Sequence, residues 1–408
     1  MKTIKGGVTS AKGFNVCGVS AGIKAKDKLD TALIVSDVPA TAAIVTTTNA
    51  VKAAPVLWDD AVIGEDYNIK AVIINSGNAN ACTGAQGIDD VHAEVDAVSK
   101  AFSCDAHEVA VASTGVIGVP LPVEKIIDAV PELIAGLSAD DEAADQAARA
   151  ILTTDTVPKT AAVQVLIGGK TVTVGGMAKG SGMICPNMAT MLSFVTTDCA
   201  ITRDCLQTIL SETVGDTYNM MSVDGDMSTN DTVLLLANGK AQNKEIVDKD
   251  SADYLTLKKA VYAVNEMLAK AIVRDGEGAT KLIEVELTGA ATKTEAKILA
   301  KGVVTSNLVK AAFFGEDANW GRVLSSLGST GVAFDPQKVT LEFKSAGGSV
   351  TLYKKGQPLS FNEELAKKVL EQKEITVLVK MEEGNASAKS WGCDLTYDYV
   401  KINGEYRT

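Results

Sequence analysis

Short apolar runs separated by glycine- and asparagine-rich loops recur through the first third of this 408-residue chain, and they constrain the fold more than any other feature. Residues 31–35 and 71–74 are two such runs, each of a length suited to a buried strand. Residues 88–102, 121–137 and 139–152 instead carry apolar positions three and four residues apart, as amphipathic helices do. Strands that feed covering helices through glycine loops predict a layered α/β fold.

The same mixture of elements continues to the end of the chain. Two β-rich runs between residues 161 and 179 flank Gly168-Gly169, which predicts a hairpin. The other patterns predict helices at residues 201–218, 250–273 and 362–372, and strands at residues 191–197, 232–237, 281–288, 338–344, 349–353 and 374–381. Because the pattern changes after about residue 285, we predict two domains, residues 1–284 and a smaller α+β domain of residues 285–408.

Composition narrows the class of partner. The formal net charge of −12 disfavours a general nucleic-acid or acidic-membrane surface and favours small-molecule chemistry. Seven scattered cysteines without a C-x-x-C pair indicate neither a disulfide framework nor a structural zinc site. The chain opens without a signal or transit peptide and has no 18-residue apolar run, so we expect a soluble, cytoplasmic protein.

Histidine is scarce. The two histidines, His92 and His107, lie on or beside predicted helices in polar surroundings, where a surface role is the usual one. A Ser-His-Asp triad or a histidine-ligated metal is therefore not expected, and we predict no metal and no bound cofactor. If the chain is an enzyme that transfers acyl groups, it needs a base other than histidine.

The segment from Lys179 to Leu192 offers such a base. Its glycine- and proline-bearing loop leads into Thr190 at the expected beginning of a strand. Attack of the Thr190 hydroxyl on the Ala189 carbonyl, followed by hydrolysis, would leave Thr190 with a free α-amine. An α-amine has a pKa near 7.7 to 8.0, against about 10.4 for lysine, so far more of it is free base at pH 7. On spacing alone, a plain loop before a strand remains the simpler interpretation.

The string around Pro186-Asn187-Met188-Ala189-Thr190-Met191-Leu192 resembles the cleavage motif of the ornithine acetyltransferase family of arginine biosynthesis. Further segments match that family in order along the chain: residues 6–14, 75–84, 113–118, 153–156, 313–322 and 399–408. The resemblance implies a layered α/β domain of the N-terminal-nucleophile type, followed by a smaller C-terminal domain.

The resemblance also implies an activity. The chain would cut itself between Ala189 and Thr190 into an α chain, residues 1–189, and a β chain, residues 190–408, that assemble as two copies of each. An acetyl group would pass from N2-acetyl-L-ornithine to L-glutamate by a ping-pong mechanism through acetyl-Thr190, which gives L-ornithine and N-acetyl-L-glutamate. Some family members also use acetyl-CoA as a second donor, and no signature in this sequence decides that point.

For the site, the resemblance implies an oxyanion hole at Thr114 and Gly115, where a hydroxyl and a backbone N–H can stabilise a tetrahedral intermediate. It implies substrate contacts from Thr153, Lys179, Thr190, Glu277, Asn403 and Thr408. A buried Lys179 can neutralise an α-carboxylate, and Glu277 can accept hydrogen bonds from an ammonium group. The sequence does not separate Thr153 from its neighbour Thr154, although Thr153 is favoured.

Two other functions remain open from the residues alone. One is an amidase or aminopeptidase with the same nucleophile, in which water replaces glutamate; the other is an uncleaved metabolite-binding protein. We assign no catalytic role to Asn319, Trp320 and Arg322, which a helix start with a buried tryptophan explains. Cys185 has no identifiable base and is interpreted as a packing residue of its loop.

Overall fold

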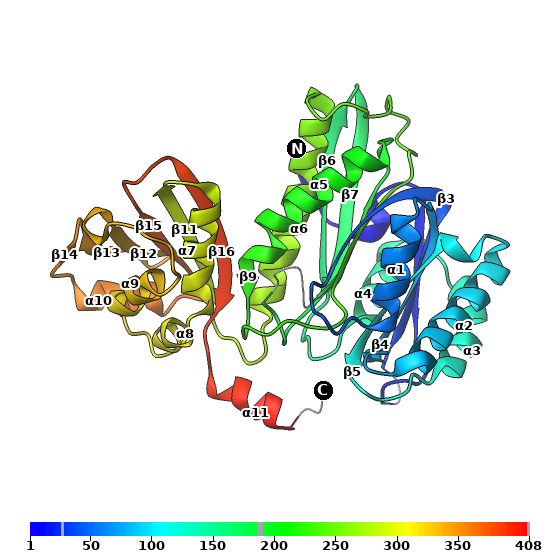
Figure 1. Ribbon diagram of the computed structural model, residues 1–408, viewed down its shortest axis with the longest axis horizontal. Helices are drawn as coiled ribbons and strands as arrows, with labels where there is room; N and C mark the ends of the chain where they lie inside the picture. The colour runs from blue at the N-terminus through cyan, green and yellow to red at the C-terminus, as the bar shows by residue number, and fades with distance from the viewer. Residues whose placement is uncertain (26–27, 186–190, 406–408) are drawn as a thin grey trace.

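The computed structural model describes residues 1–25, 28–185 and 191–405 of the chain (Figure 1). Its larger part is built on a nine-stranded sheet of order β1-β6-β7-β8-β10-β3-β4-β5, with β2 paired to β3. The strands are β1 (Lys2–Ile4), β2 (Phe14–Val19), β3 (Thr31–Thr46), β4 (Ile69–Asn78), β5 (Val109–Val116), β6 (Lys159–Ile167), β7 (Lys170–Lys179), β8 (Leu192–Thr197) and β10 (Thr232–Ala237).

The long strand β3 divides this sheet into two halves. Its pairing with β4 shifts between Val35 and Ala40, and residues 37–39 between them are exposed. Before this irregularity β3 pairs with β2 and β4; after it Ala40 still lies opposite Ile69 of β4, and residues 41–46 pair with β10. The two halves pack face to face, and residues of both, such as Ile34 and Phe194, belong to one buried cluster between them.

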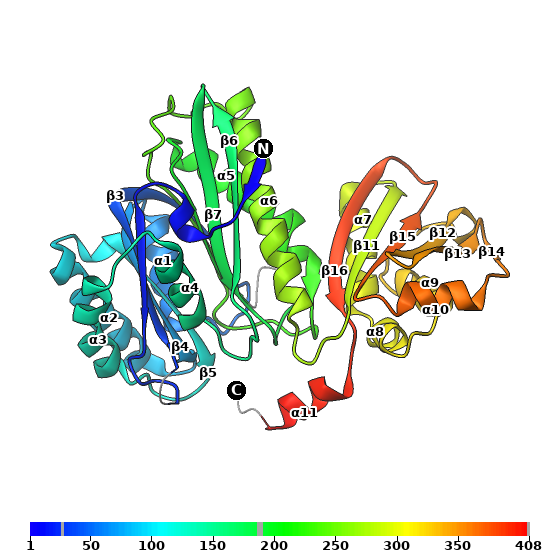
Figure 2. The same cartoon turned by 180° about the vertical axis from the view of Figure 1, so that it is seen from behind.

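Helices cover the outer faces of both halves. Successive β3 residues point to opposite faces, so Ile34 enters the inner cluster while Leu33 packs with residues of α2 and α3. On the other half, Val195 of β8 packs outward with residues of α5 and α6. Figure 2 shows α6 running alongside β6 and β7. The helices of this part are α1 (Ala54–Gly64), α2 (Gly84–Phe102), α3 (Val123–Ala135), α4 (Asp141–Ala150), α5 (Arg203–Asp216) and α6 (Ala252–Arg274). α4 differs from α2, α3, α5 and α6, because its buried alanines belong to the inner cluster. The predicted layered α/β class is confirmed.

A second sheet of order β14-β13-β12-β15-β11-β16-β9 forms the smaller part. Its elements are β9 (Met221–Ser222), β11 (Leu282–Ala290), α7 (Lys293–Thr305), α8 (Asn307–Phe314), α9 (Trp320–Gly328), β12 (Thr340–Ser345), β13 (Gly348–Lys354), β14 (Gln357–Pro358), α10 (Glu363–Leu370), β15 (Glu374–Lys380), β16 (Ala386–Cys393) and α11 (Tyr397–Glu405). The predicted boundary between residues 284 and 285 falls inside β11, because residues 282–290 form one continuous strand. The division of the chain into two domains stays a prediction.

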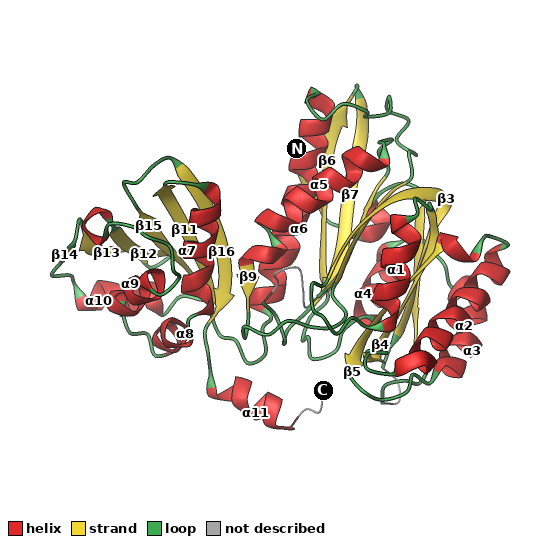
Figure 3. Ribbon diagram, in the orientation of Figure 1, coloured by secondary structure: helices red, strands yellow, loops and turns green. Residues whose placement is uncertain are grey.

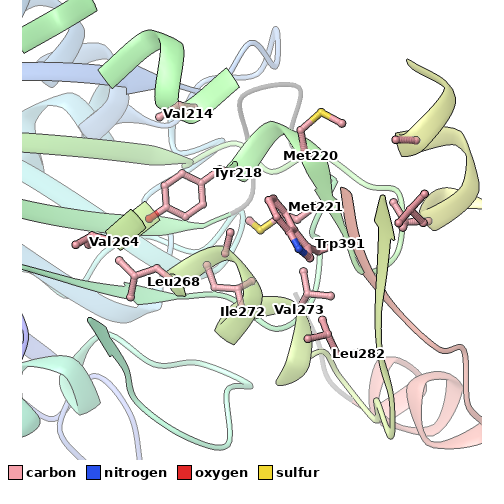
Figure 4. Close-up of a cluster of buried hydrophobic side chains, with 14 of the residues drawn as sticks. Val214, Tyr218, Met220, Met221, Val264, Leu268, Ile272, Val273, Leu282 and Trp391 are labelled. Atoms are coloured by element: carbon pink, nitrogen blue, oxygen red, sulfur yellow. The ribbon is translucent and has the colours of Figure 1, made fainter. Parts of the chain in front are cut away.

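A shared core joins the two parts. β9 pairs with β16, where Met221 lies opposite Trp391, so the second sheet includes a strand from the chain before β11. Trp391 is fully buried, and Figure 4 shows it beside Met221 and near Ile272 and Val273 of α6. The hydrophobic cluster runs without a break from α5 and α6 into the second sheet. No helix in the described part of the chain is long and apolar enough to cross a membrane.

Candidate active site

The strand ends of the two sheet halves meet at one end of the sandwich and surround a pocket. β4, β5 and β7 end there, and β8 and β10 begin there, since Leu192 is paired with both Lys179 and Thr232. Figure 3 shows loops gathered at this end, with α11 beside them. The pocket has a volume of about 300 Å³ and is lined by Ala79, Thr114, Gly115, Ile117, Thr153, Thr154, Lys179, Gly182, Met183, Asp224, Asp226, Met227, Ser228, Thr229, Asn230, Glu277, Tyr399 and Asn403.

The structure brings most of the predicted site residues together in this pocket. Those it places there are Thr114, Gly115, Thr153, Lys179, Glu277 and Asn403. Thr153 and Thr154 both line the pocket, so either threonine is placed to contact a substrate. Ala189, Thr190 and Thr408 lie outside the described residues. The described chain resumes at Met191, directly before β8 and beside this pocket.

A close approach of β4 and β5 shapes the wall at Thr114 and Gly115. Gly115 has a φ of 137°, and a Cβ atom there would overlap the Gly77 backbone, so the turn requires glycine. Asn230 fixes the turn from the other half of the sheet, because its Nδ2 donates to the carbonyl oxygens of Ser113 (2.9 Å) and Ala79 (2.5 Å). The wall thus presents a threonine hydroxyl beside a glycine backbone, the donor types of an oxyanion hole.

Lys179, the last residue of β7, supplies a buried cation to the same wall. Its side chain is only 8% exposed, and its Nζ donates to Thr114 Oγ1 at 3.1 Å. Because that oxygen accepts from the lysine, the Thr114 hydroxyl hydrogen is left to donate elsewhere. Burial lowers the pKa of Lys179, and the nearby Lys159 cation adds to this effect while the Asp155 carboxylate opposes it.

A buried ion-pair network lies under Lys179. Lys159 Nζ is 2.6 Å from Asp155 Oδ1 and 2.6 Å from Asp275 Oδ2. Asp155 also accepts from the backbone N–H of Gly180, the residue after Lys179, at 2.7 Å. Burial alone would raise the pKa of Asp155, but the Lys179 and Lys159 cations outweigh it and lower the pKa to about 2. Asp155 is therefore a carboxylate at neutral pH and balances the charge of Lys179.

The opposite wall of the pocket is acidic. Glu277 is 8% exposed and follows the end of α6, and its backbone N–H donates to the Ser181 carbonyl at 3.0 Å. Its Oε2 accepts from Nδ2 of Asn403 in α11 at 2.7 Å. Gly182 packs directly against the carboxyl group, where a Cβ atom would overlap it. A cation at one wall and a carboxylate at the other suit a ligand that carries both charges, as amino acids do.

Sequence reasoning missed several lining residues. Asp224 accepts from the Tyr399 hydroxyl at 3.2 Å and from two backbone N–H groups, and Asn230 anchors the glycine turn. Their signal in the sequence is weak: an acidic, glycine-containing loop at residues 224–231 between two strands. Loops of this composition are common, so only the fold shows that this one faces the pocket.

Residues that were not assigned to the site lie elsewhere. His107 stacks between the rings of Trp58 and Tyr67, and His92 packs edge-on against Trp58; neither histidine lines the pocket. Asn319 caps α9 by accepting from Arg322 N–H, as the predicted helix start requires, whereas Trp320 is only partly buried and stacks on Tyr353. Within residues 1–25, 28–185 and 191–405, no three acidic, histidine or cysteine side chains are grouped to hold a metal ion.

The strand ends of this layered α/β fold enclose a buried cation, a hydroxyl beside a glycine turn and an opposing carboxylate. This combination defines an enzyme that acts on small polar molecules. The chain belongs to the ArgJ family, whose model matches residues 15–408. The family resemblance and the enzyme class predicted from the sequence are thereby confirmed.

Relatives of known name match the chain over its whole length. The "Arginine biosynthesis bifunctional protein ArgJ" of Caldanaerobacter subterraneus subsp. tengcongensis is 50% identical over 408 residues, which is 100% of both chains. The protein of the same name from Symbiobacterium thermophilum is 51% identical over 410 residues, again 100% of both. Among solved structures, the arginine biosynthesis bifunctional protein argJ of Bacillus halodurans is 45% identical with a TM-score of 0.51, covering 53% of this chain and 100% of that chain.

Proposed function

We propose that this chain transfers the acetyl group of N2-acetyl-L-ornithine to L-glutamate, through an acetyl ester on Thr190 formed after the Ala189–Thr190 bond is cut. Membership of the ArgJ family supports the reaction class. The observation that carries the proposal is the contact between Lys179 and Thr114 beside Gly115, in the pocket next to the beginning of β8. Thr190 is two residues before that strand in the sequence.

The charges of the pocket fit acetylornithine at both ends. Its α-carboxylate, a group that glutamate shares, pairs with Lys179, and its side-chain ammonium pairs with Glu277. In the first half-reaction the Thr190 amine takes the hydroxyl proton, and Oγ1 attacks the acetyl carbonyl. The Thr114 hydroxyl and the Gly115 N–H donate to the developing oxyanion, and the C–N bond breaks as ornithine leaves with the proton. Glutamate nitrogen then attacks the ester by the reverse sequence.

The size of the solved relative supports cleavage. The whole Bacillus halodurans chain aligns with 53% of this chain, so it is a polypeptide of about half the length. Residues 190–408 are 219 of the 408 residues, a similar share. The Lys159–Asp275 ion pair supports continued association of the fragments, because it would join residues 1–189 to residues 190–408. We propose two copies of each fragment in the assembly.

Two finer points belong to the same proposal. We propose acetyl-CoA as a second acetyl donor, since the relatives are called bifunctional proteins. We also propose that the enzyme works in the cytoplasm, which is supported by seven cysteines that are all free thiols. Synthesis of N-acetylglutamate from acetyl-CoA and glutamate alone, without acetylornithine, tests the second donor.

Labelling of the acetyl group tests the main reaction. The protein is incubated with acetyl-labelled N2-acetyl-L-ornithine, and the label is expected on the fragment that begins at Thr190 and on no other. Addition of glutamate should release it as N-acetylglutamate. Rapid release by water without glutamate would instead support the amidase or aminopeptidase. A Thr190→Ala variant, which lacks the nucleophile, is the control and should take up no label.

A further inference from the structure

Asp224 lies in the loop after β9 and binds three donors from two distant segments. Its carboxylate accepts from the backbone N–H of Met183 at 2.6 Å (Oδ2) and of Ile184 at 2.7 Å (Oδ1). The third donor is the hydroxyl of Tyr399 in α11, at 3.2 Å from Oδ2. Two adjacent backbone N–H groups need two acceptor oxygens, which a carboxylate supplies at once.

The contact between the two segments is reciprocal. Val223 N–H donates back to the Ile184 carbonyl at 2.6 Å, and the Ile184 side chain is fully buried. Met183 has a φ of 56°, in the left-handed region that an unbranched non-glycine residue adopts only at some cost in energy. Residues 183 and 184 are thus held in a bent backbone conformation by groups on the 223–224 segment.

The chain on the other side of the proposed cleavage site is fixed as well. Leu192 begins β8 and is paired with Lys179 of β7 and Thr232 of β10. The Met191 carbonyl accepts from Thr232 N–H at 3.1 Å. The segment that contains the Ala189–Thr190 bond therefore begins at the residues bound by Asp224 and ends at a strand in the middle of the sheet.

We propose that Asp224 is a positioning residue for self-cleavage, because it fixes the start of the segment that must bend for Thr190 to attack the Ala189 carbonyl. This inference rests on the proposed function. In that step the Thr190 Oγ1–Ala189 carbon bond forms, the Ala189–Thr190 C–N bond breaks, and the hydroxyl proton moves to the released amine. Water then hydrolyses the ester. The role of Asp224 is to restrict the backbone at Met183 and Ile184, where this segment begins, and so to raise the fraction of reactive conformations.

The test is the rate of cleavage in an Asp224→Asn variant of the full chain. Asparagine keeps one acceptor oxygen but places an NH2 group against the second backbone N–H, so one of the two bonds becomes a repulsion. Freshly translated protein is sampled over time, and the fraction of full-length chain is read from a denaturing gel. We expect cleavage at least about tenfold slower than in the wild type, which corresponds to one lost charge-assisted hydrogen bond.

A matched control is Asp198→Asn. Asp198 is fully buried, whereas Asp224 is partly buried, and Asp198 likewise accepts from two backbone N–H groups, those of Thr173 (2.8 Å) and Lys12 (3.3 Å). It follows the end of β8, whereas the pocket lies at the beginning of that strand. This variant should lose thermal stability and still be cleaved at the wild-type rate. To compare folds without cleavage, the melting temperature of Asp224→Asn is measured in the Thr190→Ala background.

The outcomes separate the two proposals. An uncleaved wild type would contradict the proposed function itself. Normal cleavage in the wild type, in Asp198→Asn and in Asp224→Asn alike would overturn only the role of Asp224. Tyr399→Phe removes the third donor alone and should slow cleavage less than Asp224→Asn does. Equal slowing in both variants would show that the effect passes through α11, which also overturns the inference.

Discussion

At the scale of single residues, the chemistry of the pocket depends on how Lys179 and Thr114 share one hydrogen bond. Because Lys179 Nζ donates to Thr114 Oγ1, the threonine hydroxyl is oriented with its hydrogen free for another acceptor. The Gly115 backbone beside it provides a second donor type in a turn that requires glycine. Together they would stabilise an oxyanion without reorganisation during the reaction.

Thr114→Ala removes one of these two donors. We expect kcat for acetyl transfer to fall about 100- to 1000-fold, equivalent to roughly 2.7 to 4 kcal/mol of transition-state stabilisation. KM for glutamate should change little, because the lost bond forms only as the oxyanion develops. Steady-state kinetics on cleaved protein measure both constants. A kcat within about threefold of the wild type would show that Thr114 is not an oxyanion donor.

Asp155→Asn tests the buried charges at the same scale. The folded pKa of Asp155, about 2, lies below the ordinary value of 3.8, so its contribution to stability is present above pH 4 and is lost as pH falls through 2. The variant leaves Lys159 with Asp275 alone and should cost about 3 kcal/mol of unfolding free energy at pH 7. Urea unfolding from pH 7 to pH 2.5 should show this difference shrinking below pH 4; a constant difference contradicts the ionised carboxylate.

At the scale of elements, the site is made by loops that join strand ends rather than by the strands themselves. Gly182, in the loop after β7, lies against the Glu277 carboxyl group, in the loop after α6. A Gly182→Ala variant should displace that carboxylate and raise KM for acetylornithine about tenfold, with a smaller effect on kcat. Initial rates at varied acetylornithine measure the change.

Gly64→Ala serves as the control for that glycine variant. Gly64 ends α1, and apart from its chain neighbours and the backbone of its own helix no heavy atom lies within 4 Å of the position its Cβ would take. Its kinetic constants should equal those of the wild type. An unchanged KM in Gly182→Ala would show that the position of Glu277 does not determine substrate affinity.

Most helices and strands were predictable, because their buried residues recur in the sequence at helical or strand spacing. In β8 every residue is buried and is either apolar, serine or threonine, and α6 repeats its apolar residues at helical spacing. β16 was missed, since half of it alternates exposed polar residues and its buried half contains Ser390 and Gly392. α1 was missed as well; its apolar residues are spread around the helix, so no stripe marks one face.

The residues of the candidate site also fall into those that were predicted from the sequence and those that were not. Thr114, Lys179 and Glu277 were identified through family motifs, and neither propensity nor spacing would have distinguished them from surface residues. Asp224 and Asn230 lie outside the segments that resemble the family, and they reach the pocket only because β10 lies in the middle of the sheet. The local sequence pattern predicts which residues are buried. It does not predict which distant loops meet at the pocket, because that depends on the order of the strands in the sheet.

At the scale of the whole molecule, the two sheets behave as one core. Trp391 is fully buried against this shared cluster, and its Nε1 donates to Glu284 Oε2 at 2.9 Å. Trp391→Ala should lower the free energy of unfolding by about 3 to 5 kcal/mol, because it leaves a cavity between the sheets. Denaturant unfolding measures the change. A loss below about 1 kcal/mol would show that the sheets are stabilised independently.

The central claim, that Thr190 becomes the N-terminal nucleophile of a self-cleaved acetyltransferase, is tested most directly by the intact mass of the purified protein. The account predicts two polypeptides, residues 1–189 and 190–408, and a gain of one acetyl group on the second after brief exposure to N2-acetyl-L-ornithine. Thr190→Ala should give a single full-length mass and no adduct. A wild-type protein that shows one full-length mass while it transfers acetyl groups at full rate would contradict the claim.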